Sequence, residues 1–107
     1  MLEADLQRSI VVAARDFGWL VYATYRSFRS EPGFPDLVMV HPKTGRVIIA
    51  EIKTAKGTLS KPRWNKAGTR LLPGQDTWGE AFEAAPGVEY YLWRPADLDE
   101  IYAILQR

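Results

Sequence analysis

The chain has 107 residues, of which 47% are hydrophobic and 25% are charged, and its net charge is +1. These values are typical of a soluble globular protein, and the length favours a single domain over residues 1–107. No apolar run approaches the length of a membrane span and no basic-then-apolar leader is visible, so we expect neither a membrane partner nor secretion, and the absence of cysteine is compatible with the reducing cytoplasm that we expect. The lack of cysteine excludes disulfides and thiolate sites, and the single histidine, His41, excludes a multi-histidine zinc site within one chain. Any metal would be held by oxygen ligands, which favours Mg²⁺ or Mn²⁺.

The first stretch, residues 2–17, is predicted to be an amphipathic helix. Leu2, Leu6 and Ile10 recur at the spacing that places apolar side chains on one helical face. Glu3 lies in the first turn, where an acid also complements the helix dipole, so its presence there has an ordinary structural explanation as well as a functional one.

A strand is predicted over residues 19–25 from its β-branched and aromatic content. The loop that follows, residues 25–33, alternates aromatic residues with Arg26 and Arg29. Aromatic rings can stack on bases and arginines can contact phosphates, so we predict that the two arginines bind nucleic acid. The alternative is a solvated loop whose aromatics pack into the core.

The centre of the chain reads as a β-hairpin. Two apolar runs, 37–40 and 47–52, flank a segment, 41–46, that contains the Pro and Gly typical of turns. Both runs are apolar at nearly every position instead of alternating. Such strands are usually covered on both faces, which predicts a central position in a sheet between helices.

Three ionisable residues interrupt this apolar block: Asp36, Glu51 and Lys53. If the hairpin loop is 42–45, Asp36 lies opposite Glu51; if it is 44–45, Asp36 lies opposite Lys53. Both registers gather the three side chains on one face, whereas a three-residue loop would separate them. Two carboxylates and an ammonium in a dry sheet cost stability unless they are paired or bind a metal. The cluster is therefore a candidate functional site, with a structural ion pair as the alternative.

These residues resemble a known family. Pro35-Asp36 followed by Glu51-Ile52-Lys53 on the next strand resembles the PD-(D/E)xK nuclease signature. The lead-in Gly33-Phe34-Pro35-Asp36-Leu37 and the later Gln75-Asp76-Thr77-Trp78 are similar to the VRR-NUC branch, in its stand-alone phage or bacterial form. The resemblance covers the chain from Glu3 to about Trp78. It implies an α/β fold with a mixed β-sheet flanked by helices.

The resemblance also implies roles for the site residues. Asp36, Glu51 and the backbone carbonyl of Ile52 would bind one or two Mg²⁺ or Mn²⁺ ions, with Glu3 as a further acid near the metal. Lys53 would hold or polarise the attacking water.

Gln75 is the fourth catalytic residue that the resemblance implies, and it would reach toward the site lysine. In the family this glutamine follows a Leu-Ser-x-x segment, but here Leu59-Ser60 is followed by other residues and the glutamine comes only at position 75. The sequence leaves two explanations open: an insertion after Ser60, or a different role for Gln75.

After the hairpin, residues 53–70 contain six basic residues and no acid. Glycines and a proline predict a loop or a broken element here. A solvated charged face is the ordinary explanation, but phosphate contacts dominate nucleic-acid affinity and this stretch adjoins the candidate site. The predicted nucleic-acid contacts, besides the two arginines above, are Lys56, Lys61, Arg63, Lys66 and Arg70.

The rest of the chain is predicted as a helix over 74–85, a strand over 88–93 and a helix over 95–105. The expected element order is thus αβββαβα.

The function expected from the resemblance is Mg²⁺-dependent endonucleolytic hydrolysis of DNA, selective for structure more than sequence. A branched substrate such as a four-way (Holliday) junction, a homodimer, and the cytoplasm of a bacterium or phage-infected host follow by analogy. One alternative is a nucleic-acid-binding module without cleavage. Another is a small-molecule or tRNA-related hydrolase on the same fold.

Overall fold

The computed structural model describes residues 1–24 and 30–107, so the predicted contacts Arg26 and Arg29 lie outside the described residues. In the described part of the chain, no helix has both the length and the apolar character needed to cross a membrane. The elements follow the expected order, with two short strands added after the hairpin: α1 (Glu3–Asp16), β1 (Leu20–Ala23), β2 (Leu37–Val40), β3 (Val47–Ile52), β4 (Arg63–Trp64), β5 (Leu71–Leu72), α2 (Gln75–Ala84), β6 (Glu89–Trp93), the 3-10 helix η1 (Pro95–Asp97) and α3 (Leu98–Gln106).

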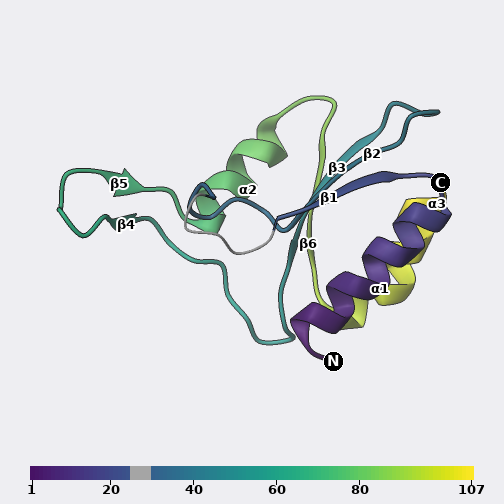
Figure 1. Ribbon diagram of the computed structural model, residues 1–107, viewed down its shortest axis with the longest axis horizontal. Coiled ribbons are helices and arrows are strands. Elements are labelled where there is room, and N and C mark those ends of the chain that lie inside the picture. Colours follow the sequence, from purple (N-terminus) through teal and green to yellow (C-terminus); the bar gives the residue numbers. More distant parts are fainter. Residues whose placement is uncertain (25–29) are drawn as a thin grey trace.

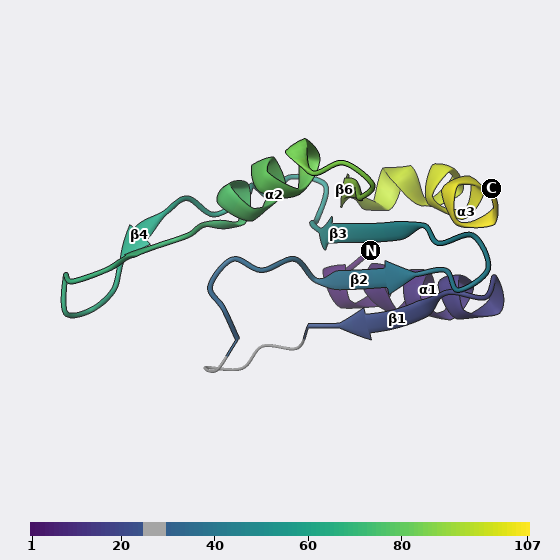
Figure 2. The same cartoon turned by 90° about the horizontal axis from the view of Figure 1, so that it is seen from above.

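The main sheet has four strands in the order β1-β2-β3-β6. Strands β1, β2 and β3 are antiparallel neighbours, and β6 runs parallel to β3, which confirms the predicted mixed α/β sheet. In Figure 1 the strands run between α2 and the side-by-side pair α1 and α3. Figure 2 shows the same sheet from above, with β1, β2 and β3 in succession.

Helices cover both faces of the sheet because successive residues of a strand point to opposite sides. On β6, Trp93 is part of the core and Tyr91 packs against it, whereas Tyr90 stacks on Phe82 of α2 at a ring-centroid distance of 6.4 Å. The core side of the sheet faces α1 and α3. Its buried residues are Leu6, Ile10, Ala14, Trp19, Leu37, Met39, Ile48, Ala50, Ile52, Trp93, Ile101, Ile104 and Leu105.

Strand β3 is covered on both faces, as its unbroken apolar run predicts. Ile48, Ala50 and Ile52 enter the core, while Ile49 and Glu51 are buried on the opposite face. The sequence pattern therefore placed this strand correctly in the middle of the sheet.

The hairpin adopts the first of the two registers left open by the sequence. Leu37 pairs with Ala50, and the loop is closed by the His41 N–H donating to the Arg46 carbonyl at 2.9 Å. Gly45 has a φ of +74°, a conformation that glycine adopts without strain. Continuing this pairing by one residue sets Asp36 opposite Glu51.

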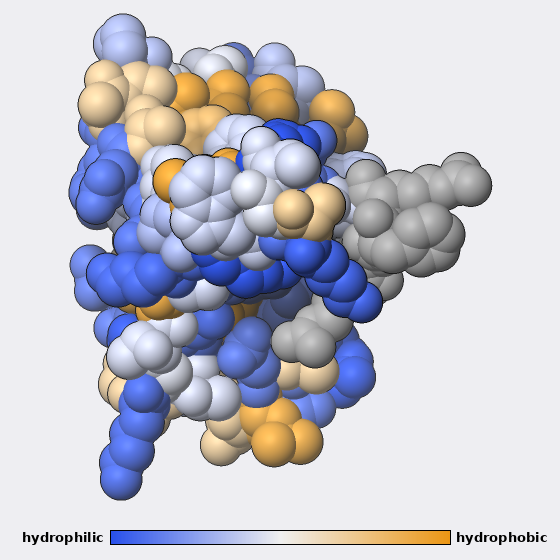
Figure 3. All heavy atoms as spheres, turned by 90° about the vertical axis from the view of Figure 1, so that its left-hand side faces the viewer, coloured by the Kyte–Doolittle hydropathy of each residue, from blue (hydrophilic) through white to orange (hydrophobic). Residues whose placement is uncertain are grey.

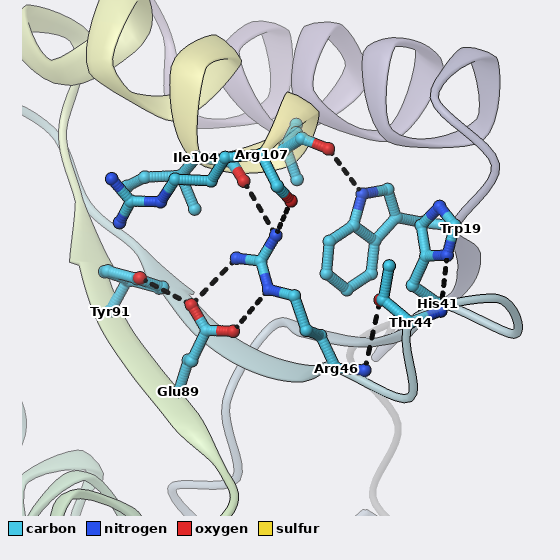
Figure 4. Close-up of polar contacts among 9 residues, drawn as sticks. Trp19, His41, Thr44, Arg46, Glu89, Tyr91, Ile104 and Arg107 are labelled. Atoms are coloured by element: carbon cyan, nitrogen blue, oxygen red, sulfur yellow. Dashed lines mark hydrogen bonds and ion pairs between the residues drawn. The ribbon is translucent and has the colours of Figure 1, made fainter.

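A polar cluster ties the hairpin turn to β6 and to the C-terminus (Figure 4). Arg46 donates from Nε and Nη2 to the two carboxylate oxygens of Glu89, at 2.8 and 2.9 Å, and from Nη1 to the carbonyls of Ile104 and Arg107. Its guanidinium also lies 5.1 Å from the Trp19 ring centroid. The cluster stands at the opposite end of β3 from Glu51, so it stabilises the fold without taking part in the candidate site.

The stretch predicted as a loop or a broken element contains a two-stranded ribbon that projects from the body (Figure 1). We call residues 61–74 the basic ribbon. Trp64 pairs with Leu71, and the side chain of Asn65 closes the turn by accepting the Thr69 N–H at 2.9 Å. Two-residue strands give no periodicity to read, and the ordering hydrogen bonds come from one asparagine, so the sequence showed only the turn residues.

Candidate functional site

Glu51 is the buried ionisable residue around which the site is built. Its side chain is 1% exposed, on the face of β3 that points away from the main core. Its Oε1 accepts a hydrogen bond from Gln75 Nε2 at 3.2 Å. Its Oε2 is buried and has no hydrogen-bond partner in the described structure. A buried carboxylate oxygen without a hydrogen-bond partner is costly.

Asp36 is held beside Glu51 by the backbone of β3. The Ile52 N–H donates to Asp36 Oδ2 at 2.8 Å, and the Thr24 N–H donates to the Asp36 carbonyl at the same distance. The Asp36 side chain is therefore fixed by the strand that also carries Glu51. The structure brings together the two carboxylates that the sequence predicted.

The two carboxyls interact strongly. Burial and the neighbouring Asp36 carboxyl raise the pKa of the Glu51 carboxyl to about 9, and the charge of Glu3 adds to the increase. The positive charge of Lys53 lowers the pKa of Glu51 in opposition. Asp36 and Lys53, the two residues predicted to share a face with Glu51, thus both act on the Glu51 carboxyl. A cation beside the two acids would relieve the repulsion that raises the pKa.

Gln75 reaches Glu51 because the chain returns to Ser60 after the basic ribbon. The Ser60 N–H donates to Gln75 Oε1 at 3.0 Å, and the Gln75 N–H donates to Ser60 Oγ at 3.0 Å. A backbone N–H only donates, so it fixes which end of the amide faces Ser60 and turns the NH₂ group toward Glu51. The ribbon therefore separates Ser60 and Gln75 in sequence only, while the fold brings them into contact.

The Gly33-Phe34-Pro35-Asp36 lead-in positions both sides of the site. Gly33 has a φ of +78°, and a Cβ there would lie 2.6 Å from the carbonyl carbon of Gly74. Phe34 packs edge-on against Trp78 at 5.1 Å between ring centroids. The lead-in therefore presses against the start of α2, next to Gln75, as it delivers Asp36. The sequence showed the motif, but its contact with Gly74 depends on the fold.

Lys53 and Glu3 approach the carboxylates from different elements. The Lys53 N–H donates to the Trp93 carbonyl at 3.0 Å, which continues β3 past Ile52, and the side chain is half-buried. Glu3 lines a groove of about 700 Å³ between α1 and β1 that also reaches Asp36. This groove gives solvent a route to Asp36.

Among the described residues, no group of three or more Asp, Glu, His or Cys side chains is placed to hold a metal ion. Glu3 therefore does not join Asp36 and Glu51 as a third side-chain ligand, and what it contributes in this structure is charge. The oxygen donors that remain are the two carboxylates and the backbone carbonyl of Ile52. Three protein oxygens would leave positions open in the coordination shell of an ion, and Mg²⁺ usually fills such positions with water and substrate oxygens.

The predicted nucleic-acid contacts of the described chain are exposed. Lys56 lies in the turn after β3, and this turn is held by Arg94, whose Nη1 donates to the carbonyls of Thr54 and Gly57 at 2.6 and 2.8 Å. Nothing in the sequence pointed to Arg94 in this role. The other four predicted contacts, Lys61, Arg63, Lys66 and Arg70, lie on the basic ribbon.

No protein-family model, curated protein or solved structure matches the chain. The PD-(D/E)xK assignment stays a prediction, and the support for it is the geometry of the site itself.

Proposed function

We propose that this protein is a metal-dependent nuclease that hydrolyses phosphodiester bonds in DNA, with a site of the PD-(D/E)xK type on its mixed sheet. The observation that carries the proposal is Glu51. A carboxyl that is 1% exposed, with one unpartnered oxygen and a second acid beside it, is costly in a structural role. Such a cost is typical of a functional site.

The residues present fit a hard divalent cation. Asp36, Glu51 and the Ile52 carbonyl offer oxygen atoms alone, which suits Mg²⁺ or Mn²⁺. Glu51 Oε2 has no hydrogen-bond partner in the described structure, so its lone pairs are available to a metal ion. When bound, such an ion supplies charge stabilisation at phosphate oxygens and a more acidic water.

The protein's own side chains prepare this site. The Ile52 N–H orients Asp36, and Gln75 fixes Glu51. The Lys53 ammonium lies close enough to Glu51 to act on its charge, and the same ammonium would hold the attacking water and offset negative charge that develops on the phosphate. Lysine suits this position because its charge is compact and its donors are rotatable.

Structure-selective cleavage of branched DNA by a homodimer is the finer part of the proposal. The basic ribbon beside the site supports a polyanionic substrate, since its four cations are exposed and no acid lies among them. Two copies of the chain would present two sites to a four-way junction, and light scattering on free and DNA-bound protein tests that stoichiometry.

Cleavage of a DNA panel by matched variants tests the nuclease proposal. Linear, flapped, single-stranded and four-way substrates are incubated with Mg²⁺ or Mn²⁺, and Asp36→Asn and Glu51→Gln are compared with Glu80→Gln, an exposed acid on α2. We expect the first two variants to lose at least about 100-fold in rate. Calorimetry should show Mn²⁺ binding to the parent and to Glu80→Gln only.

Equal cleavage by the parent and Asp36→Asn would remove the assignment of this site. Tight DNA binding by the parent, with no cleavage under any metal, would favour the binding module without catalysis.

A further inference from the structure

The basic ribbon carries an apolar pair that the fold does not bury. Trp64 and Leu71 lie directly opposite each other across the two strands, so their side chains share one face. Trp64 is 63% exposed and Leu71 is 52% exposed. Trp64, one of four tryptophans in the chain, is therefore exposed on β4, part of the projecting ribbon (Figure 1), where it adds little to stability.

The surroundings of this pair are cationic. The ribbon contains Lys61, Arg63, Lys66 and Arg70 and no acidic residue. Its two ion pairs with the body are weak, because Lys61 lies 3.4 Å from Asp76 and Arg70 lies 3.7 Å from Glu31 through largely exposed cations. Seen from the ribbon's side, hydrophilic atoms form a band across the middle of the molecule (Figure 3). The positive charge of the ribbon favours a polyanionic partner over an apolar protein surface.

The ribbon is built to keep its shape. Asn65 accepts the N–H groups of Thr69 and Arg70 at 2.9 and 3.3 Å, and its own N–H donates to the Arg70 carbonyl at 3.0 Å. Trp64 on β4 thus directly precedes a preformed turn, which lowers the ordering cost of binding.

The base of the ribbon adjoins the candidate site. Ser60 precedes it and hydrogen-bonds to Gln75, the residue that follows Gly74 at the ribbon's end, and Gln75 bonds to Glu51. A DNA segment held along the ribbon therefore leads to the two carboxylates.

We infer that the basic ribbon selects DNA with unpaired bases, with Trp64 stacking on an exposed base face, Leu71 packing beside it, and the ribbon's cations contacting the flanking phosphates. This inference rests on the proposed function for its substrate class. In an intact duplex each base face is covered by its neighbours, whereas a gap, flap or junction exposes faces on which an aromatic ring can stack. Trp64 is then the residue that makes the protein prefer interrupted DNA.

Fluorescence anisotropy with Ca²⁺ in place of Mg²⁺ measures this preference without cleavage. The probes are a labelled perfect duplex and the same duplex with a short single-stranded gap. We expect Trp64→Ala to weaken binding to the gapped DNA by about tenfold and binding to the duplex by less than about twofold, with Trp64→Phe restoring most of the loss.

Two control variants separate base contact from charge and from general apolar loss. Lys66→Ala removes a ribbon cation and should weaken both DNAs equally, because phosphates are present in each. Phe17→Ala removes an exposed aromatic outside the ribbon and should change neither. Thermal unfolding checks that Trp64→Ala is folded, which its exposure leads us to expect.

An equal effect of Trp64→Ala on both probes, or no effect, would overturn the inference. So would a Trp64→Ala protein that turns from dimer to monomer in light scattering with unchanged gap preference, since Trp64 would then serve an interface between copies. Gap preference through Trp64 in a protein that never cleaves would sustain this inference while removing the proposed nuclease activity. Cleavage of DNA by a protein whose gap preference does not depend on Trp64 would sustain the nuclease proposal and remove this inference.

Discussion

At the scale of single residues, Gly33 shows how one backbone position sets the site. Its φ of +78° excludes most side chains, and its close approach to the Gly74 backbone excludes even a methyl group. We expect Gly33→Ala to lower the free energy of unfolding by about 3 kcal/mol, from the left-handed conformation and the steric overlap together. Denaturant unfolding measures this loss.

Gly45 is the matched control, because it has a φ of +74° and an added Cβ would meet nothing within 4 Å. Gly45→Ala should therefore cost only about 1 kcal/mol, the conformational part of the penalty. Equal losses in the two variants would show that the contact with Gly74 does not constrain the lead-in.

Gln75 and Ser60 allow activity and stability to be separated. Gln75→Ala removes the donor that holds Glu51, and loss of such a supporting contact to a metal ligand typically lowers activity by about 10- to 100-fold. Ser60→Ala keeps the backbone N–H that orients the Gln75 amide, and removes only the hydroxyl that accepts the first N–H of α2.

Ser60→Ala should thus cost about 1 kcal/mol of stability, as loss of a helix N-cap does, with cleavage within about twofold of the parent. Cleavage rates and unfolding curves of both variants test the pair together. A large drop in cleavage with Ser60→Ala at unchanged stability would contradict the proposed division of roles.

At the scale of elements, the Arg46–Glu89 contact joins the hairpin to β6 and α3. The hydrogen bond from Arg46 lowers the pKa of the Glu89 carboxyl below its usual value of 4.5. A lowered pKa means that the folded state binds this proton less readily than the unfolded state does. The contact therefore stabilises fully above about pH 5 and is lost as the pH falls through the lowered pKa.

The difference in unfolding free energy between the parent and Glu89→Gln tests this linkage. At pH 7 we expect the parent to be more stable by about 2 kcal/mol, since hydrogen bonds to charged groups contribute in this range. The difference should shrink toward pH 3. Glu51 is present in both proteins, so its own titration cancels. A difference that stays constant with pH would show that the Glu89 charge adds nothing.

The elements also show where sequence pattern is sufficient and where it is not. The apolar run of β3 predicted a strand buried on both faces, and the structure confirms it. The same prediction was wrong for β2, because Val38 is only partly buried and Val40 is exposed on one face of this strand. The hairpin register stayed open between two alternatives, since the four-residue loop depends on Gly45 and on hydrogen bonds across the turn. The hydrogen bonds between Ser60 and Gln75, 15 residues apart, form only in the tertiary structure, so the sequence pattern could not predict them.

At the scale of the whole molecule, the net charge of +1 gives little overall attraction to DNA. The cations of the basic ribbon are concentrated on one projecting element, so the ribbon, and not the whole protein's field, should set the salt dependence of binding. Each phosphate contact adds roughly −0.9 to the slope of log K against log salt on duplex DNA. Individual cations can therefore be counted.

Lys66 and Lys43 make the sharpest comparison, since both are exposed lysines in turns, one on the ribbon and one in the β2–β3 hairpin loop at the far end of β3 from Glu51. Lys66→Ala should make the slope shallower by about 1, while Lys43→Ala should leave it unchanged. Replacing residues 62–73 by a short glycine linker removes three cations and should reduce the slope by about 3. Anisotropy titrations of duplex DNA between about 50 and 200 mM salt measure these slopes. A Lys43 effect as large as that of Lys66 would place the DNA on another face and separate the ribbon from substrate binding.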